Sequence, residues 1–264
     1  MSARSDVTYV YDGSFEGLLT AVFESFENRE LPCSIVAEDE FVPTLFACKT
    51  VDTDPQKADR VRRGLKNVSA DVWNAVRLGY LTCVEDRGTL INDFVHMAMH
   101  YGAGVMRMLA DDTVSRLTKA VRALKQESHK YTGFVRFSIS EDNTFTSIIE
   151  PKNSVLPLLA PHFCDRYPNE SFLIYDKTHS QALVWHNRQK MIIPLDGFEQ
   201  PQAGDEELYF RVLWKHFYDT VAIEARYNPR CRMNFMPKRY WNQLPEMDES
   251  NSPDAVRGVK RIGA

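Results

Sequence analysis

The chain has 264 residues, 44% of them hydrophobic, with a formal net charge of -4 and a pI near 6.0. A chain of this length and hydrophobic content can bury one large core or two modest ones, so we expect a globular protein. Its negative charge excludes nucleic-acid binding by bulk electrostatics, so any such contact has to come from a local basic patch.

The cysteines and the hydrophobic pattern exclude further classes of protein. The five cysteines lie far apart and form no CxxC pair, which argues against a zinc ribbon, an iron-sulfur site or a disulfide framework. The N-terminal residues lack an apolar leader segment, and no window approaches the roughly 18 apolar residues of a membrane span. We therefore expect a cytoplasmic protein without membrane contact and without a cofactor.

The first half of the chain predicts strands followed by a helical block. Residues 7–12 (VTYVYD) are typical of a strand, and Ser14 is a suitable N-cap for the amphipathic helix that follows. Residues 41–51 (FVPTLFACKTV) have the composition of a further strand, in which Pro43 indicates an edge or a beginning. From about residue 54 to residue 127 the apolar residues recur at helical spacing, which predicts several packed helices.

The second half changes to a period of two, which is typical of strands. Residues 133–139 (GFVRFSI) and 144–151 (TFTSIIEP) flank a polar turn and predict a hairpin. A short helix with prolines is predicted next, and three more runs predict a meander: SFLIYD, QALVW and QKMIIPLD. We expect residues 131–196 to form one antiparallel sheet.

A long helix is predicted near the C-terminus, over residues 208–226. We expect it to pack on the sheet through the apolar stripe of Phe210, Leu213, Phe217 and Val221. The predicted fold class is therefore α+β, with an antiparallel sheet built from a hairpin and a meander, a helical subdomain and a long C-terminal helix.

The expected domain organisation is simple. We predict a single α+β domain over residues 1–246, with a helical insertion at about residues 54–130. Residues 247–264 are rich in Asp, Glu, Ser, Pro and Gly, a composition that predicts a disordered tail.

One candidate for catalysis lies in the proline-containing helix. His162, Asp165 and Arg166 fall within about one helical turn, so the histidine could act as a general base and the arginine could hold a phosphate. The alternative is an ion pair combined with a helix C-cap by the histidine or the arginine.

A second candidate is a set of possible metal ligands. Asp93, His96 and His100 share one face of a predicted helix, as in metal-binding helices. The glutamate that follows the first histidine in such helices is missing, and no further ligand is evident. We therefore predict that no metal is held there, and the alternative reading is that the histidines are packing or surface residues.

The most basic stretch is residues 226–241 (RYNPRCRMNFMPKRYW), which contain no acidic residue. We call it the basic segment, and its candidate nucleic-acid contacts are Arg226, Arg230, Arg232, Lys238, Arg239, Tyr240 and Trp241. The cations would contact phosphates, and Tyr240 or Trp241 would stack on bases. The alternative is that the aromatic side chains fold back on the core while the cations stay solvated or pair with acids.

Arg136 is a further candidate contact. In the predicted strand it lies on the same face as Phe134 and Ser138, because side chains alternate along a strand. Phe134 and Arg136 could then stack on bases from an open sheet, as in RNA-recognition strands.

Several segments resemble a bacterial family of domains of unknown function whose members are described as DNA metabolism or DNA repair proteins. The segment LWKHFYDTVAIEARYNPRCRMNFMPKRYWNQLPE is similar to the C-terminal signature of that family. The segments YVYDGSFEGLLTAVFESF, GFVRFS with the following IIEP, and VLPLLAPHFCDRYPNESFLIYD also resemble its pattern, so the resemblance covers most of residues 7–246. One position departs from the pattern, because His179 in YDKTHSQALVW stands where an arginine is expected, which puts a phosphate-binding role there in doubt.

The resemblance implies a pathway and a partner but supplies no catalytic residues. Members of the family are typically encoded beside a radical-SAM protein, and related domains are fused to uracil-DNA glycosylase-like domains. We therefore predict a protein that binds DNA, or a nucleotide product of DNA repair, and acts with a radical-SAM partner. One alternative is an enzyme that processes nucleic acid or a modified base through His162 or the face of Asp93, His96 and His100. The other is a structural adaptor for the radical-SAM partner.

Overall fold

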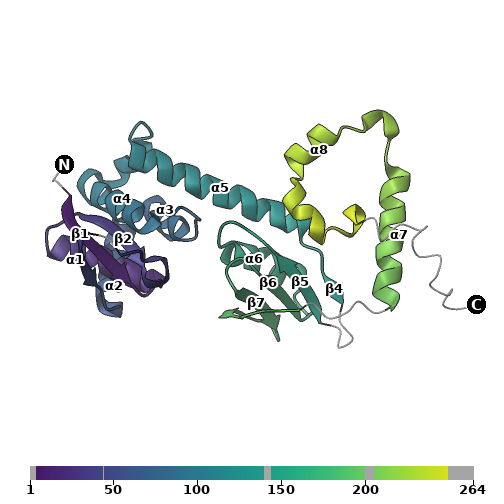
Figure 1. Cartoon of the computed structure of the whole chain (residues 1–264), viewed down its shortest axis with the longest axis horizontal. Coiled ribbons are helices and arrows are strands. Elements are labelled where there is room, and N and C mark those ends of the chain that lie inside the picture. The colour runs from purple at the N-terminus through teal and green to yellow at the C-terminus, as the bar shows by residue number, and fades with distance from the viewer. Residues whose placement is uncertain (1–3, 44, 140–143, 200–204, 249–264) are drawn as a thin grey trace, which may run out of the picture. The chain divides into compact units, whose positions relative to one another are not determined.

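The computed structural model describes residues 4–43, 45–139, 144–199 and 205–248 (Figure 1). The chain divides into two compact units, one formed by residues 1–126 with 152–154 and the other by residues 127–151 with 155–264. This division differs from the single domain with a helical insertion that the sequence predicts. The helices of that block share a core with the N-terminal strands, and together they form the first unit.

The first unit contains a three-stranded parallel sheet. Its strands pair in the order β2-β1-β3: β1 (Ser5–Tyr11), β2 (Pro32–Ala37) and β3 (Ala47–Thr50). Helix α1 (Phe15–Glu27) connects β1 to β2, and the Ser14 hydroxyl accepts a hydrogen bond from the Gly17 amide, as the predicted N-cap requires. The crossover through α1 explains the parallel pairing of β1 and β2, since parallel neighbours need a long connection.

Helices complete the first unit and confirm the predicted helical block: α2 (Pro55–Val68), α3 (Ala70–Tyr80), α4 (Arg87–Tyr101), the 3-10 helix η2 (Gly102–Arg107) and the first part of α5 (Asp112–Phe134). Apolar side chains from the sheet and from these helices are buried together, among them Leu18, Ile35, Leu65, Ile91 and Phe94. Among the described residues, none of the helices combines the length and the apolar character needed to span a bilayer.

The second unit contains a five-stranded sheet in the order β4-β5-β6-β7-β8: β4 (Ser138–Ile139), β5 (Phe145–Ile149), β6 (Phe172–Asp176), β7 (Gln181–His186) and β8 (Gln189–Pro194). The pairs β4-β5, β6-β7 and β7-β8 are antiparallel, as predicted, whereas β5 and β6 are parallel. The predicted short helix, α6 (Leu156–Arg166), lies between β5 and β6 in the chain. It forms the crossover that a parallel pair needs. The fold is therefore α+β, as predicted, with a mostly antiparallel second sheet.

The predicted strand over residues 133–139 is wrong for most of its length. Helix α5 continues to Phe134, and β4 contains only two residues. The helix extends this far because Tyr131 is fully buried and packs with Phe134 on Tyr240, whose ring centroid lies 5.0 Å from each of theirs. Phe134 and Arg136 therefore do not share a face of an open strand.

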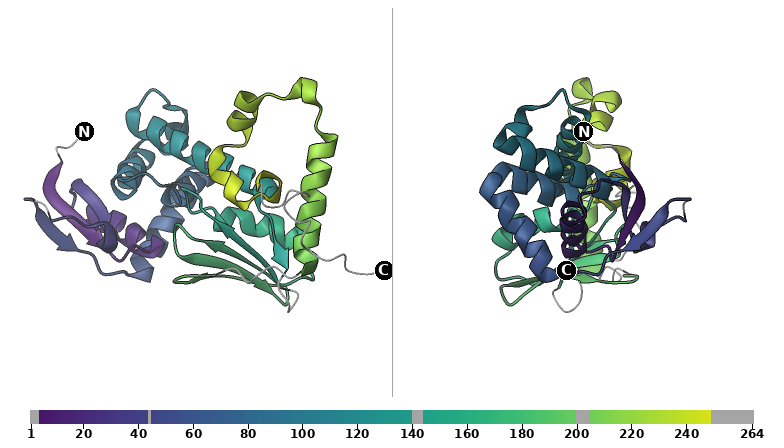
Figure 2. Two further views of the ribbon diagram at one scale, coloured as in Figure 1. Left: turned by 45° about the vertical axis from the view of Figure 1, so that its right-hand side comes forward. Right: turned by 90° about the vertical axis from the view of Figure 1, so that its left-hand side faces the viewer.

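The C-terminal part of the second unit is helical: α7 (Asp205–Val221), η3 (Glu224–Arg226), α8 (Pro229–Phe235), η4 (Lys238–Gln243) and η5 (Pro245–Met247). The ribbon runs up α7 and returns through α8 as an arch (Figures 1 and 2). Helix α7 ends at Val221, earlier than the predicted residue 226. Residues 249–264 of the predicted tail lie outside the described residues.

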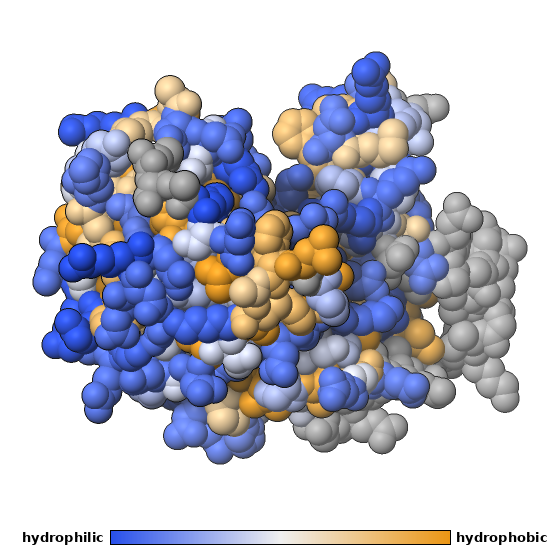
Figure 3. All heavy atoms as spheres, turned by 60° about the vertical axis from the view of Figure 1, so that its left-hand side comes forward, coloured by the Kyte–Doolittle hydropathy of each residue, from blue (hydrophilic) through white to orange (hydrophobic). Residues whose placement is uncertain are grey.

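The predicted packing of α7 is wrong. Phe210 and Phe217 are each 55% exposed, and Leu213 and Val221 are exposed as well. The apolar stripe that the sequence shows is real, but it faces solvent within the second unit. Figure 3 shows one face of the molecule, on which apolar side chains gather in separate patches among hydrophilic ones.

Because Phe217 is exposed, its replacement by alanine should change the free energy of unfolding by less than about 1 kcal/mol. Phe172 is fully buried in the sheet of the same unit, and Phe172→Ala should cost about 3 to 5 kcal/mol. Urea denaturation of both variants measures the difference. Equal destabilisation by the two substitutions would show that α7 is buried on its apolar side.

Candidate nucleic-acid interface

The local sequence of the basic segment explains its short helices. The side chain of Asn228 caps α8 by accepting a hydrogen bond from the Cys231 amide at 2.9 Å, and Pro229 occupies the first turn. Asn-Pro is thus both the end of the preceding segment and the beginning of α8. Pro237 then precedes η4, so the chain changes direction twice within the basic segment. The cations of the segment therefore lie in different environments.

Tyr240 and Arg239 belong to the interior of the second unit. Tyr240 is fully buried against Tyr131 and Phe134 and offers no face to a base, which corrects its assignment as a stacking residue. The Arg239 guanidinium lies 2.9 Å from a carboxylate oxygen of the buried Glu127 and donates a hydrogen bond of 2.6 Å to the Tyr240 hydroxyl. Burial raises the pKa of Tyr240, so this hydroxyl remains protonated at neutral pH. Arg239 is therefore part of the scaffold.

Arg136 also binds its own protein. Its Nη1 donates to the Gly133 carbonyl at 2.7 Å, and its Nη2 lies 3.1 Å from a carboxylate oxygen of Glu246. The other oxygen of Glu246 accepts a hydrogen bond from the indole of Trp214 at 3.0 Å. Arg136 thus joins the end of α5 to η5 and α7, in place of the predicted role on an open sheet.

Trp241 is held by neighbours within the basic segment. Its indole N–H donates to the Met236 carbonyl at 2.9 Å. The guanidinium of Arg232 lies 4.9 Å from the ring centroid and the Lys238 ammonium lies 5.9 Å from it, which are cation–π distances. A base that stacked on this ring would therefore compete with these cations.

Two of the remaining cations, Arg226 and Arg232, border a hollow between the end of α7 and α8, which we call the α7–α8 hollow. Its volume is about 310 Å3, and it is lined by Tyr218, Ala222, Ile223, Arg226, Tyr227, Asn228, Cys231 and Arg232. Arg226 and Arg230 are exposed and form no ion pair with any residue that the structure describes. The Arg232 guanidinium lies 5.8 Å from the ring of Tyr227, and its buried Nε has no hydrogen-bond partner among the residues that the structure describes.

Two aromatic residues of this hollow were not among the predicted contacts. Tyr227 is 69% exposed, and Tyr218 comes from the last turns of α7. The sequence signal that could have predicted their position is Asn228-Pro229, which ends one helical stretch and begins the next. Residues just before and just after this turn become neighbours in space. The hollow therefore combines cations with one exposed and one partly buried aromatic ring, and cations and aromatic rings are the two kinds of side chain that bind single-stranded nucleic acid.

The predicted catalytic group does not come together. His162, Asp165 and Arg166 are all exposed on α6. Arg166 lies over the ring of Tyr167 at 5.7 Å, and the ring of His162 contacts the edge of Phe163. Among the described residues no hydrogen bond joins the histidine to the aspartate, so the three side chains do not form a general-base site.

Asp93, His96 and His100 lie on α4 and bind different partners. Asp93 pairs with Arg4 at 2.5 Å, and burial raises the pKa of this carboxyl. The ring of His96 lies 2.9 Å from the Ser25 hydroxyl and stacks on Phe26. Burial lowers the pKa of His96, whereas His100 is exposed at the end of the helix. The three side chains do not converge, and no group of three or more potential metal ligands occurs in the described ranges of the chain.

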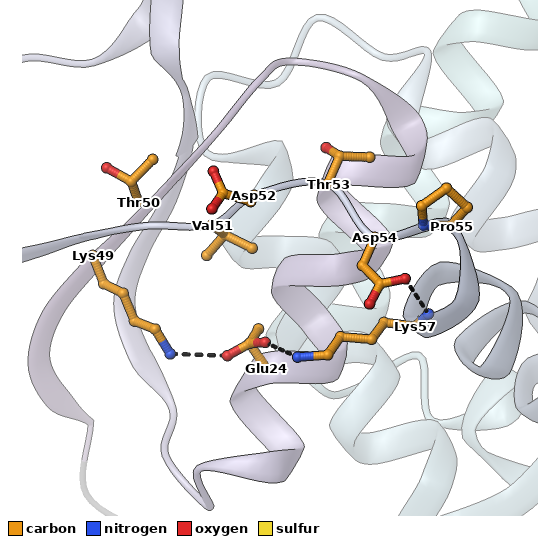
Figure 4. A pocket seen from close by; sticks show the side chains of 9 residues that line it. All are labelled: Glu24, Lys49, Thr50, Val51, Asp52, Thr53, Asp54, Pro55 and Lys57. Carbon is orange, nitrogen blue, oxygen red and sulfur yellow. Dashed lines mark hydrogen bonds and ion pairs between the residues drawn. The ribbon is translucent and has the colours of Figure 1, made fainter.

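A second hollow lies at the carboxyl end of β3 in the first unit (Figure 4), where the sequence indicated no site. In parallel sheets ligands bind at this end of the strands. Glu24 of α1 lies between two cations of the lining, with Lys49 at 2.9 Å on one side and Lys57 in close contact on the other. Asp54 caps α2 by accepting from the Gln56 amide at 2.8 Å. The charges of this hollow therefore hold α1, β3 and α2 together.

The charge network around Glu24 predicts a dependence of stability on pH. Hydrogen bonds from Lys57 and Lys49 lower the pKa of Glu24 to about 2. Because the folded-state pKa lies below that of the unfolded chain, the network stabilises the first unit fully at pH 5 and loses its contribution as the pH falls toward 2. In Glu24→Gln the free energy of unfolding should fall less steeply over this range, as measured by urea denaturation at several pH values. Glu38→Gln, at an exposed position, is the matched control, and a Glu24→Gln curve parallel to the wild type would contradict the prediction.

The comparison with known proteins identifies a family. The model of DUF4130, a domain of unknown function, matches residues 85–246. These residues begin just before α4, include the sheet of the second unit and the α7–α8 hollow, and end in η5. Neither the curated proteins nor the solved structures contain a significant match. Since the match covers more than half of the chain, the protein belongs to the DUF4130 family.

Proposed function

We propose that this protein acts in DNA metabolism or repair and binds DNA, or a nucleotide product of repair, at the α7–α8 hollow. The observation that carries the proposal is the arrangement of Arg226 and Arg232 beside Tyr218 and Tyr227 in one cavity. Arginine side chains contact phosphates, and exposed aromatic rings stack on bases. The resemblance to DNA metabolism and repair proteins supports DNA as the nucleic acid.

Single-stranded DNA suits this hollow better than a duplex. Only unpaired bases expose their faces to an aromatic side chain, and Tyr227 is the most exposed ring of the hollow. Helix α8 has seven residues, about two turns, and carries no long recognition face of the kind that enters a major groove.

The experiment is a comparison of single-stranded and duplex oligonucleotides by fluorescence anisotropy. Tyr227→Ala should weaken single-strand binding by about 1 to 3 kcal/mol, because one stacking platform is lost, and should change duplex binding much less. Tyr209→Ala, which removes an exposed ring of α7 outside the hollow, is the matched control. The proposal would be contradicted by a wild-type protein that does not bind single-stranded DNA, or by a Tyr227→Ala variant that binds it as tightly as wild type.

We propose in addition that the protein works with a radical-SAM partner. The family resemblance supports this choice, and the exposed apolar stripe of α7 supports a protein partner, since exposed apolar patches mark interaction sites. Copurification with the neighbouring radical-SAM protein should succeed for wild type and fail for a Phe210→Ser, Phe217→Ser double variant. Phe26→Ser, at an exposed ring of the first unit, should behave like wild type. Copurification that is unchanged in the double variant, or absent in wild type, would argue against this partner surface.

The adaptor alternative gives a different result in the same experiments. An adaptor binds the radical-SAM partner but neither single-stranded nor duplex DNA. The enzyme alternative receives no support from the positions of His162, Asp165 and Arg166, because the three exposed side chains do not meet. We therefore place nucleic-acid binding first.

A further inference from the structure

A third hollow lies in the second unit, where the sheet meets the C-terminal helices. Its volume is about 350 Å3, which is within the range of small-molecule sites. It is lined by residues of β4 and β5, by Lys177 and Phe198 in the connections, by Glu207 and Arg211 of α7, and by residues of η4 and η5. We call it the sheet–α7 hollow.

The lining of the sheet–α7 hollow carries three cations, Arg136, Lys177 and Arg211, and three acids, Glu150, Glu207 and Asp248, so its formal charges cancel. Arg211 Nε donates to a Glu207 carboxylate oxygen at 2.9 Å, and Arg211 Nη2 donates to the Ser138 hydroxyl at 2.5 Å. Lys177 lies 3.1 Å from Glu150. Arg136, the third cation of the lining, is paired with Glu246, as described above. A phosphate in this cavity would therefore have to displace an existing carboxylate partner.

The Arg211–Glu207 pair still has atoms that are free to form hydrogen bonds. The Glu207 side chain is 16% exposed and that of Arg211 is 28% exposed. Within the part of the chain that the structure describes, Nη1 of Arg211 and the second carboxylate oxygen of Glu207 have no hydrogen-bond partner. These two residues are four apart on α7 and both line the cavity, so together they can offer a donor and an acceptor to one ligand.

Apolar residues form much of the remaining wall, among them Ile148, Phe198, Leu244 and Pro245. A flat apolar ring can be placed against such side chains without leaving polar groups unpaired. The combination of an apolar wall, an adjacent donor and acceptor, and zero net charge favours an uncharged ring that carries hydrogen-bonding groups on its edge.

We propose that the sheet–α7 hollow binds an uncharged nucleobase or nucleoside. Every nucleobase has a flat apolar face and, on its pairing edge, a donor next to an acceptor. In this arrangement Arg211 donates to the base, Glu207 accepts from it, and Phe198 contacts its face. Within this proposal, only the choice of a nucleobase over other uncharged heterocycles rests on the proposed function. The site is separate from the α7–α8 hollow.

The test is titration of adenosine, guanosine, cytidine and uridine, with their 5′-monophosphates, into the full-length protein by calorimetry. At least one nucleoside should bind, and its monophosphate should bind no more tightly. Phe198→Ala should weaken nucleoside binding by about tenfold, the scale of one lost stacking contact. Phe235→Ala, at an exposed ring of α8, should leave it unchanged.

A change of charge provides the second variant. Glu207→Gln leaves the cavity with one excess positive charge. In this variant a monophosphate should therefore bind about fivefold more tightly than its nucleoside, which is the scale of one charge pair in water. The absence of binding for all four nucleosides, a wild-type preference for monophosphates, or nucleoside binding unaffected by both Phe198→Ala and Glu207→Gln would each overturn the proposal.

The Tyr227→Ala variant separates this proposal from the proposed function. Nucleoside binding should persist in Tyr227→Ala although single-strand binding is weakened. Loss of nucleoside binding in this variant would place the nucleoside in the α7–α8 hollow and contradict the proposal. The source of the base is tested by competition. Displacement of the nucleoside by a duplex with one mispaired base, but not by a matched duplex, would support a base extruded from DNA, and no displacement by either duplex would support a free nucleoside.

Discussion

Replacement of Tyr240 by alanine is expected to lower the free energy of unfolding of the second unit by about 3 to 5 kcal/mol, as for other large buried aromatic residues. The ring is fully buried between Tyr131 and Phe134. Its loss leaves a cavity at the end of α5 and removes the hydroxyl that accepts from Arg239. Urea denaturation followed by tryptophan fluorescence measures the effect, since Trp185, Trp214 and Trp241 all lie in this unit.

Tyr227→Ala is the matched control for this measurement. It removes the same side chain from the same segment, but at a position that is 69% exposed, and should change stability by less than about 0.5 kcal/mol. A Tyr240→Ala variant as stable as Tyr227→Ala would mean that residues 238–243 are not packed on α5.

Arg239→Ala is expected to destabilise the second unit by about 1.5 to 3 kcal/mol, the range for a lost hydrogen bond to a charged group. The reason is that buried Glu127 loses a cation at 2.9 Å while Tyr240 loses its donor. The Arg239 side chain is partly exposed, which keeps the expected loss below that of a fully buried ion pair. Arg230→Ala, at an exposed arginine of the same segment, should change stability by less than about 0.5 kcal/mol. The two variants are compared by urea denaturation, and equal stabilities would contradict a structural role for Arg239.

Much of the fold could be predicted from local patterns. The N-cap at Ser14, the helical block and the helix containing Pro161 all follow from rules that depend on near neighbours in the chain. The parallel pairing of β5 with β6 could have been deduced too, because α6 lies between them and a parallel pair needs a crossover. Strand β2 was missed because PCSIVA is short and begins with a proline.

Other features depend on contacts between distant residues. The alternation in GFVRFSI favours a strand, but Tyr131 and Phe134 find their partner in Tyr240, more than a hundred residues later, and the helix continues. The apolar stripe of α7 was visible in the sequence, yet periodicity cannot distinguish a stripe that packs on its own domain from one left for a partner.

The basic segment illustrates the same limit for the site. Composition located it, because five cations without an acid stand out in an acidic chain. Composition does not show that Glu127 of α5 holds Arg239 while Arg226 and Arg230 remain exposed. The sheet–α7 hollow has no sequence signature at all, since its lining comes from β4, β5, α7 and the C-terminal 3-10 helices.

The central claim is that the cations of the basic segment divide into a group that binds nucleic acid and a group that holds the fold. The most direct test is the salt dependence of single-stranded DNA binding by an Arg226→Ala, Arg230→Ala, Arg232→Ala triple variant and by Arg239→Ala. The triple variant should flatten the slope of log affinity against log salt by about two, at roughly 0.7 per phosphate contact on a single strand, whereas Arg239→Ala should leave the slope unchanged. An unchanged slope in the triple variant, or an equal flattening in Arg239→Ala, would contradict the division.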